Sequence, residues 1–197
     1  MNSNLLVDVR PFTKQLITES KETGNMVVEG LMQVAGDLNG NGRIYPREIL
    51  EDQIDKFKKT FIAQGNAYGE LDHPESPIVS LKNVSHVIKD LWWEGDNVMG
   101  RVEILPTSWG NIVKAILESG YTIGISSRGT GSVKELPNGK LEVQPDFELV
   151  TWDFVSNPSV QGAFMKPVSQ LNESLQISRT NSRFSKLDTI LNDILRG

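Results

Sequence analysis

Three kinds of residue that activated-serine hydrolases use lie in distinctive segments of this 197-residue chain. His73 is one of only two histidines and lies in residues 69–74 (GELDHP). Ser126 lies in the glycine-framed residues 124–129 (GISSRG), and Asp153 follows on an apolar, strand-like run. A histidine, a serine and a carboxylate together activate a serine hydroxyl, and their order along the chain varies among such enzymes. Nucleophilic catalysis by a serine is therefore the first hypothesis.

Each of these residues also has a simpler explanation. The glycines around Ser126 favour a tight turn that exposes the hydroxyl and frees backbone N–H groups to face an oxyanion, but polar turns in β-rich proteins share this composition. Imidazole is the side chain whose unperturbed pKa best suits accepting a serine proton, which favours His73 as general base. A loop histidine is nevertheless commonly a solvated polar residue. His86, in a β-like run, is better explained as a packed strand residue.

The elements that would position these residues are mostly β-strands. Apolar residues at helical spacing after Pro46 predict a helix to about residue 64, and a turn at residues 94–97 predicts a hairpin. The predicted strands are residues 27–35, 84–93, 98–105, 122–127 and 147–155, with a further hairpin around residues 137–139. Residues 65–80 are a predicted loop, which carries the candidate histidine. Residues 108–119 are the second predicted helix.

Composition excludes several classes of function. A formal net charge of −5 argues against general nucleic-acid binding, because no basic stripe is present to release counterions. The absence of cysteine excludes disulfides, thiol catalysis and cysteine-ligated zinc. No stretch approaches the roughly 20 apolar residues that span a bilayer, and the N-terminus lacks a signal-peptide pattern. We expect a soluble, intracellular protein that needs no cofactor, metal or membrane.

Five segments together resemble one protein family. They are residues 39–46 (NGNGRIYP), 69–74 (GELDHP), 90–95 (DLWWEG), 124–129 (GISSRG), and 152–153 (WD) before 157–159 (NPS). In this order they are similar to the prohead (procapsid) maturation proteases of large contractile-tailed phages, which are distant relatives of assemblin, the capsid-maturation protease of herpesviruses. The resemblance runs from about Glu29 to Pro167. It implies an α+β fold with a β-rich, assemblin-like core, in which a small β-barrel is surrounded by helices.

The resemblance also implies roles within the candidate site. The family motif places the nucleophile at the first serine of the pair, which is Ser126, and leaves Ser127 as a supporting hydrogen-bond partner. An arginine in the herpesvirus relatives places a water or a charge near the oxyanion, which suggests the same role for Arg128. In this chain Arg128 could equally pair with an acid of the core, and both interpretations stay open.

The third catalytic residue is expected on a strand a few tens of residues after the serine. The assemblin relatives use a second histidine there, but this chain has no histidine after Ser126. A carboxylate or a simple Ser-His dyad must therefore serve. Asp153 is the preferred acid, with Asp146 and Glu148 as alternatives. Asp72 is adjacent to the candidate base and would struggle to reach its neighbour's ring.

The implied function is a serine endopeptidase that acts inside the phage prohead, in the host cytoplasm. Its expected substrates are the scaffolding (core) proteins and the major capsid protein, and we expect it to form a homo-oligomer. Members of the family cut after a glutamate that lies two residues beyond an aliphatic residue, which predicts self-cleavage after Glu19 and Glu173. Residues 49–51 and 116–118 also fit the pattern but lie in predicted helices. The alternative is a non-catalytic prohead core or scaffold protein with a protease-like fold.

The chain is expected to have four parts. They are a flexible leader (residues 1–25), the protease domain (26–168), a linker rich in Ser, Asn, Gln and Arg (169–184), and a C-terminal amphipathic helix (185–197). Both self-cleavage sites fall in the leader or the linker, where poor order would let a segment enter a protease cleft. The C-terminal helix is expected to dock on the body of the protein or on a partner.

Residues 37–48 offer a different function, because they satisfy the EF-hand calcium-loop pattern from Asp37 to Glu48. Three observations weigh against a calcium module. The preceding residues predict a strand rather than a helix, Pro46 is awkward for a loop that wraps an ion, and the chain has no second copy of the loop. Calcium binding is therefore kept only as the weaker alternative.

Overall fold

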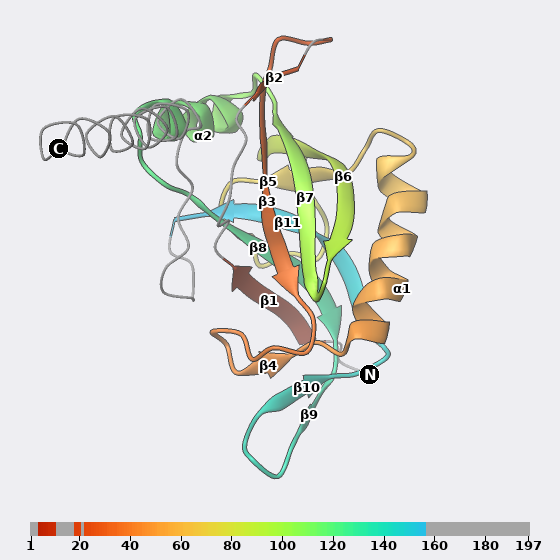
Figure 1. The fold of residues 1–197 in the computed structure, drawn as a ribbon. Helices are drawn as coiled ribbons and strands as arrows, with labels where there is room; N and C mark the ends of the chain where they lie inside the picture. The colour runs from red at the N-terminus through yellow and green to blue at the C-terminus, as the bar shows by residue number, and fades with distance from the viewer. Residues whose placement is uncertain (1–3, 11–17, 21, 157–197) are drawn as a thin grey trace, which may run out of the picture.

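The computed structural model describes residues 4–10, 18–20 and 22–156, and this part of the chain consists mainly of β-strands (Figure 1). The strands form one sheet of five strands and two sheets of three, accompanied by the helices α1 and α2. The predicted β-rich α+β class is confirmed. The expected closed barrel is not formed within these ranges, because the three sheets share no continuous ladder of the kind that a barrel requires.

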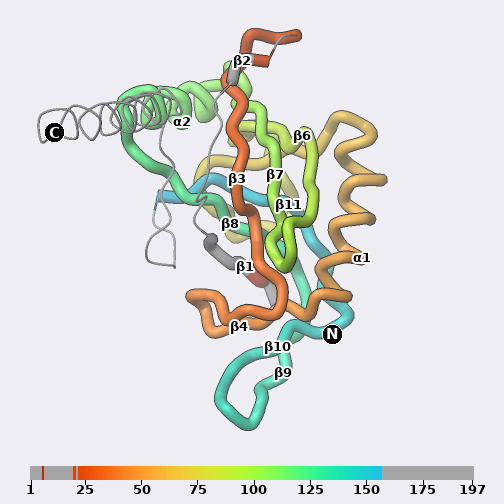
Figure 2. Tube along the Cα trace, viewed as in Figure 1, coloured from red at the N-terminus to blue at the C-terminus, as the bar shows by residue number. Residues whose placement is uncertain are grey.

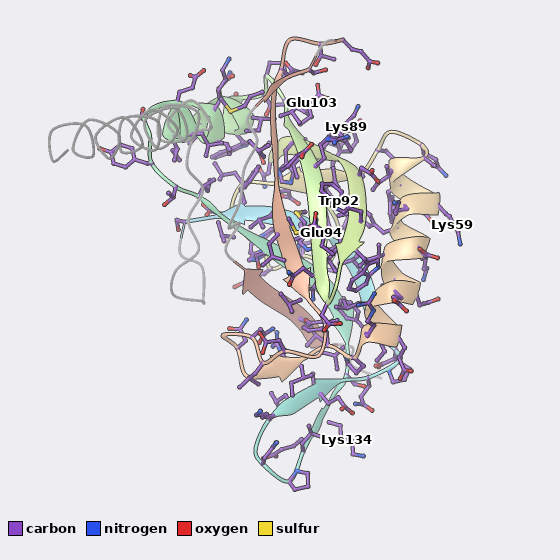
Figure 3. The ribbon with its side chains drawn as sticks, in the orientation of Figure 1. Lys59, Lys89, Trp92, Glu94, Glu103 and Lys134 are labelled. Carbon is purple, nitrogen blue, oxygen red and sulfur yellow. The ribbon has the colours of Figure 1, made fainter. Side chains whose placement is uncertain are left out.

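The five-stranded antiparallel sheet has the strand order β2-β3-β7-β6-β5. Its strands are β2 (Thr18–Glu19), β3 (Met26–Val34), β5 (Tyr68–Glu70), β6 (Val84–Glu94) and β7 (Asn97–Ile104). The predicted β6–β7 hairpin is confirmed, and Gly95 supplies the left-handed conformation at its turn (φ 61°). Across these two strands, Lys89 Nζ lies 3.5 Å from Glu103 Oε2 (Figure 3).

The second sheet carries two of the candidate catalytic residues and has the order β1-β8-β11. Its strands are β1 (Asn4–Arg10), β8 (Gly124–Gly131) and β11 (Glu148–Val155). β8 is central and runs antiparallel to both neighbours. Residues 4–10 were expected to belong to a flexible leader but form an edge strand instead, since the backbone pairs with β8 and Leu6 is buried.

The glycine-framed segment around Ser126 is extended, so the prediction of a tight turn there is wrong. The strand predicted over residues 122–127 begins at Gly124 and continues through both serines to Gly131. A Cβ atom at Gly129 would lie 2.4 Å from Phe147 Cε2. Glycine therefore serves close packing of an aromatic ring at this position, rather than a turn.

The third sheet is small and has the order β4-β10-β9. Its strands are β4 (Arg43–Ile44), β9 (Val133–Glu135) and β10 (Leu141–Val143). β9 and β10 form the hairpin predicted around residues 137–139, and Gly139 has the positive φ (77°) that its turn requires.

The two predicted helices are confirmed. Helix α1 (Arg47–Phe57) begins after Pro46 and continues into a π-helical turn, η1 (Lys58–Ile62). Helix α2 (Ser108–Glu118) is capped by Thr107, whose side-chain oxygen accepts a hydrogen bond from the Gly110 backbone N–H (3.0 Å). In the view of Figure 2, α1 lies to the right of β3, β7 and β6, and α2 lies at their upper left.

One hydrophobic core joins the five-stranded sheet, the β1-β8-β11 sheet and both helices. It includes Val28, Leu91, Ile125, Val113 and Leu50, from β3, β6, β8, α2 and α1 respectively. None of the described helices is both long and apolar enough to cross a membrane. The expected linker (169–184) and C-terminal helix (185–197) lie outside the described residues.

Candidate active site

Strands β8 and β11 place the candidate serine and acid opposite each other. Ser126 and Asp153 are register partners in the antiparallel pair, so their side chains lie on the same face of the sheet. Both residues are fully buried. The pairing of two strands therefore fixes the relative position of two of the three candidate catalytic side chains.

His73 reaches the same face from the loop that follows β5. Leu71 forms a parallel bridge with Phe154, and the Asp72 backbone N–H donates to the Phe154 carbonyl oxygen (2.7 Å). Asp72 then adopts the left-handed conformation (φ 63°), which is uncommon for a residue other than glycine. This local backbone geometry brings the next residue, His73, over the candidate acid and serine.

The three candidate side chains form a continuous hydrogen-bonded chain. His73 Nδ1 lies 2.9 Å from Asp153 Oδ2, and His73 Nε2 lies 2.5 Å from Ser126 Oγ. With the carboxylate accepting the Nδ1 proton, Nε2 is the nitrogen able to accept the serine proton. The imidazole is 16% exposed. The structure thus brings together all three residues named from the sequence.

Ser127 lies on the opposite face of β8 from Ser126. Successive side chains of a strand point to opposite faces, and Ser126 is the one that contacts His73. Ser127 is in register with Trp152 of β11 and with Asp8 of β1. The alternation of β8 therefore favours Ser126 as the nucleophile.

Arg128 is fully buried and contacts the acids of the core. Its Nε donates to Asp153 Oδ2 (2.8 Å), and its Nη2 donates to Asp153 Oδ1 (3.1 Å) and to Glu70 Oε1 (2.9 Å). Its Nη1 donates to the Ser76 carbonyl oxygen (2.6 Å). Of the two open interpretations, pairing with core acids is the one that the structure shows. A planar guanidinium that binds both oxygens of a carboxylate fixes the orientation of that carboxylate.

Glu70 is a contributor to the site that sequence reasoning did not assign. Its backbone N–H donates to Asp153 Oδ1 (2.9 Å), and its Oε1 accepts hydrogen bonds from Arg128 and from the Ser80 backbone N–H (2.8 Å). Glu70 and Ser80 flank the loop that carries His73. A buried carboxylate is costly unless paired, and here the pairing joins this loop to Arg128. Proximity to His73 was its one signal in the sequence.

His86 is a buried strand residue of β6, as predicted. Its Nε2 lies 3.0 Å from the Trp152 carbonyl oxygen, and its Nδ1 lies 2.9 Å from Ser85 Oγ. Burial lowers the pKa of His86 to about 4, although the charge of Asp153 and the Trp152 hydrogen bond oppose the shift. The ring is therefore neutral at pH 7. Gly69 is needed beside it, because a Cβ there would lie 2.2 Å from His86 Nε2.

The two alternative acids are engaged elsewhere. Asp146 Oδ1 accepts hydrogen bonds from the backbone and side chain of Ser132, and Glu148 Oε1 lies 3.7 Å from Lys56 Nζ at the surface. Of the two expected self-cleavage sites, Glu19 ends strand β2, and Glu173 lies outside the described residues.

The loop with the calcium-binding pattern is organised by its own hydrogen bonds. Asn39 Oδ1 accepts from the backbone N–H groups of Asn41 (3.0 Å) and Arg43 (2.9 Å), and Gly42 has a positive φ (74°). The element that precedes the loop is strand β3, whereas an EF-hand requires a helix there. This segment leads from β3 through β4 into α1.

Comparison with known proteins shows the family of this chain and supports its fold. Residues 4–175 match the family model described as prohead core protein serine protease. The chain is 32% identical over 152 residues to the prohead core protein protease of Enterobacteria phage T4. The aligned region covers 76% of this chain and 71% of that protein. The structure is similar to the bacteriophage T4 capsid assembly protease with a TM-score of 0.75 and 26% identity, over 80% of this chain and 100% of that one. The chain therefore belongs to the prohead core protein protease family and is a protease of phage prohead maturation.

Proposed function

We propose that this protease is a serine endopeptidase in which Ser126 is the nucleophile, His73 the general base and Asp153 the acid that orients the imidazole. The observation that carries the proposal is the hydrogen-bonded chain from Asp153 Oδ2 to His73 Nδ1 (2.9 Å) and from His73 Nε2 to Ser126 Oγ (2.5 Å). Nucleophile, base and orienting acid in mutual contact are the arrangement that activates a serine hydroxyl.

In the acylation step, Ser126 Oγ attacks the carbonyl carbon of the scissile bond while His73 Nε2 accepts the hydroxyl proton. Collapse of the tetrahedral intermediate breaks the C–N bond, and the imidazolium returns the proton to the leaving amine. A water molecule then attacks the acyl-enzyme by the same route, which releases the acid product and restores the serine. Asp153 stays ionised throughout and stabilises the imidazolium.

Arg128 and Glu70 act as positioning residues in this mechanism. The guanidinium holds both oxygens of Asp153, and the carboxylate of Glu70 holds the guanidinium. These contacts leave Asp153 Oδ2 directed at His73. Preorganisation of this kind matters because displacements of about 1 Å at a catalytic group can cost roughly 100-fold in rate.

The proposed substrates are prohead core proteins and the major capsid protein, cut after glutamate at aliphatic-x-Glu sequences inside the prohead. This extends to the present chain what the names of the T4 relatives, a core protein protease and a capsid assembly protease, say of those proteins. Self-cleavage after Glu19 and Glu173 belongs to the same proposal. Assembly into a homo-oligomer stays a prediction.

A substrate peptide with the residues 169–177 (SQLNESLQI) tests the nucleophile. We expect Ser126→Ala to abolish cleavage after the glutamate, whereas Ser127→Ala should keep at least a tenth of the wild-type kcat, because its side chain lies on the other face of β8. A fluorophosphonate label read by intact mass should modify the wild type and not Ser126→Ala. Cleavage by both variants at the wild-type rate would contradict the assignment, and loss in Ser127→Ala alone would move the nucleophile to Ser127.

A further inference from the structure

The described surface carries an apolar strip beside the loop that follows β5 (residues 71–83). We define the strip as Ile78 and Leu81 of this loop together with Trp109 and Ile112 of α2. These side chains are 74%, 75%, 39% and 44% exposed, and they are four of the six large apolar side chains exposed in the described part of the chain. Exposed apolar side chains that gather in one place mark an interaction surface, whereas scattered ones need no explanation.

A direct contact joins the two halves of the strip. Trp109 Nε1 donates a hydrogen bond to the carbonyl oxygen of Lys82 (2.9 Å), the residue that follows Leu81. Ile112 lies three positions after Trp109 in α2 and therefore on the same face of the helix. The loop and α2 thus present their exposed apolar side chains next to each other.

A hollow adjoins the strip on the side of the loop. It has a volume of about 540 Å³, and its mainly apolar lining includes Ile78, Leu81, Phe61, Tyr68 and Leu149. Pockets that bind ligands commonly measure roughly 300–1,000 Å³. An aliphatic side chain of another segment would be buried in this hollow while its neighbours cover the strip.

The described chain ends next to this surface. The Phe154 carbonyl oxygen accepts a hydrogen bond from the Asp72 backbone N–H (2.7 Å), and Phe154 forms a bridge with Leu71. The residues after 156 therefore start at the base of the same loop. Residues 157–186, at up to about 3.6 Å each, are long enough to return the segment that follows them to the strip.

That segment, residues 187–195, has the apolar pattern of a docking helix. Its apolar residues follow the i, i+3, i+4, i+7, i+8 spacing of one helix face, and polar residues fill the positions between; they are Leu187, Ile190, Leu191, Ile194 and Leu195. Isolated helices shorter than about 12–15 residues are marginal in water, so a helix here requires a partner surface. Laying the apolar face of a helix into an apolar groove is a common mode of recognition.

We propose that residues 187–195 dock as an amphipathic helix on the apolar strip of the same chain, with an aliphatic side chain in the adjoining hollow. Because surface and occupant belong to one polypeptide, a high effective concentration favours docking within the chain over docking on a second copy. This docking is independent of the serine endopeptidase function proposed above, and the Ser126→Ala chain tests it without self-cleavage.

The docked helix restrains a segment that contacts the residues around the catalytic acid. The Ser76 carbonyl oxygen accepts a hydrogen bond from Arg128 Nη1 (2.6 Å), and the Ser80 backbone N–H donates to Glu70 Oε1 (2.8 Å). Ile78 lies midway between these two anchors. A helix packed on Ile78 therefore stabilises the loop that follows β5.

Hydrogen exchange of the full-length Ser126→Ala chain tests the docking. The amides of residues 187–195 should be protected, and Leu81→Asp and Ile112→Asp should each raise their exchange rates roughly tenfold or more, because each puts a charge into the contact. Both replaced side chains are exposed, so the fold should persist. The matched control, Leu38→Asp, changes an exposed leucine (41%) outside the strip and should leave the protection unchanged. Unprotected amides in the parent, or protection that survives both strip variants, would overturn the proposal.

Changes in the helix provide the reciprocal measurement. Leu187→Asp combined with Leu191→Asp should speed exchange of the amides of residues 78–82 roughly threefold or more, because their cover is lost. Thr189→Asp lies on the polar face of the helix and should have no such effect. Equal exchange in the parent and the double variant would contradict docking on this loop.

Protein concentration separates docking within one chain from docking on a second copy. The protection of residues 187–195 should be the same at low and at high concentration, because an intramolecular contact does not depend on mass action. Protection that appears only at high concentration would assign the strip to a second copy and overturn the proposal.

Discussion

At the scale of single residues, Asp153 is the point at which the site is held together. Its Oδ1 accepts hydrogen bonds from the Glu70 backbone N–H and Arg128 Nη2, and its Oδ2 accepts from Arg128 Nε and His73. Every partner of the carboxylate is therefore a donor. A buried group with this many charge-assisted bonds has one stable orientation, and that orientation sets the position of the imidazole.

Asp153→Asn should reduce kcat by roughly 10⁴-fold, the loss seen when a triad acid becomes an amide. Either orientation of the amide turns its NH2 group toward donors. A hydrogen bond from Arg128 is lost in both orientations, together with the one from the Glu70 backbone N–H or the one from His73. Peptide cleavage measures the effect. Asp146→Asn changes an exposed acid that was an alternative candidate, and we expect its kcat within twofold of wild type. Equal losses in both variants would refute the role of Asp153.

Glu70→Gln should lower the free energy of unfolding by about 3 kcal/mol, because removing one partner of a buried ion pair leaves the other charge uncompensated. Urea unfolding in the Ser126→Ala background avoids self-digestion. Glu29→Gln is the control, since its pair with Arg101 is partly exposed and should contribute about 1 kcal/mol or less. A cost for Glu70→Gln no larger than that of the control would show that the buried pair with Arg128 does not hold the loop.

At the scale of elements, contacts at the junction of β5, β6 and β11 hold β11, the strand that carries Asp153. His86 of β6 contacts the Trp152 carbonyl oxygen of β11, and Gly69 of β5 permits this close approach. The His86 ring also packs on Phe154, with the ring centroids 4.5 Å apart. The strand that carries Asp153 is thus held by a neutral, buried imidazole.

This junction predicts an acid-sensitive stability. The pKa of His86 is about 4 in the folded state, against an ordinary 6.5, so above pH 6.5 the ring is neutral in both states and costs nothing. As the pH falls from 6.5 toward 4, the unfolded chain binds a proton that the folded chain does not. Stability should therefore decrease by about 2 kcal/mol between pH 7 and pH 5 from this residue.

Urea unfolding of Ser126→Ala with and without His86→Gln, at pH 7 and pH 5, measures this contribution. The variant is expected to be less stable at pH 7 but to lose less stability on acidification. An identical pH dependence in the two proteins would show that His86 does not titrate as its burial requires.

At the scale of the whole molecule, the same cleavage pattern occurs in segments of different structure. Glu51 lies within α1 and Glu118 is the last residue of α2, whereas Glu19 ends a two-residue strand beside an exposed turn. A protease draws an extended segment into its cleft, so helical sites are protected. The wild type should lose residues 1–19 and 174–197 on incubation. The peptide bonds that follow Glu51 and Glu118 should stay uncut, as intact-mass spectrometry would show. Ser126→Ala should stay whole; early cuts within either helix would contradict this account.

The sequence predicted the elements that depend on local information. The helix after Pro46 and the β6–β7 hairpin follow from residue spacing and turn composition over 10 to 20 positions. The edge strand β1 (NLLVDVR) contains four Leu or Val residues in seven, but its partner β8 lies more than a hundred residues later, and no local pattern shows that pairing. Likewise, Gly129 reads as a turn residue, and only the packing of Phe147 explains it.

The amino-acid sequence by itself determined the family and the three candidate catalytic residues, because His73, Ser126 and Asp153 each lie in a short, recognisable segment. The tertiary structure alone decided that Arg128 pairs with Glu70 and Asp153 and that β1 borders the nucleophile. Arg128 and Glu70 are 58 positions apart, and His73 and Asp153 are 80 apart. Such contacts arise from strand pairing and core packing, which depend on the whole chain at once and leave no pattern in any one segment.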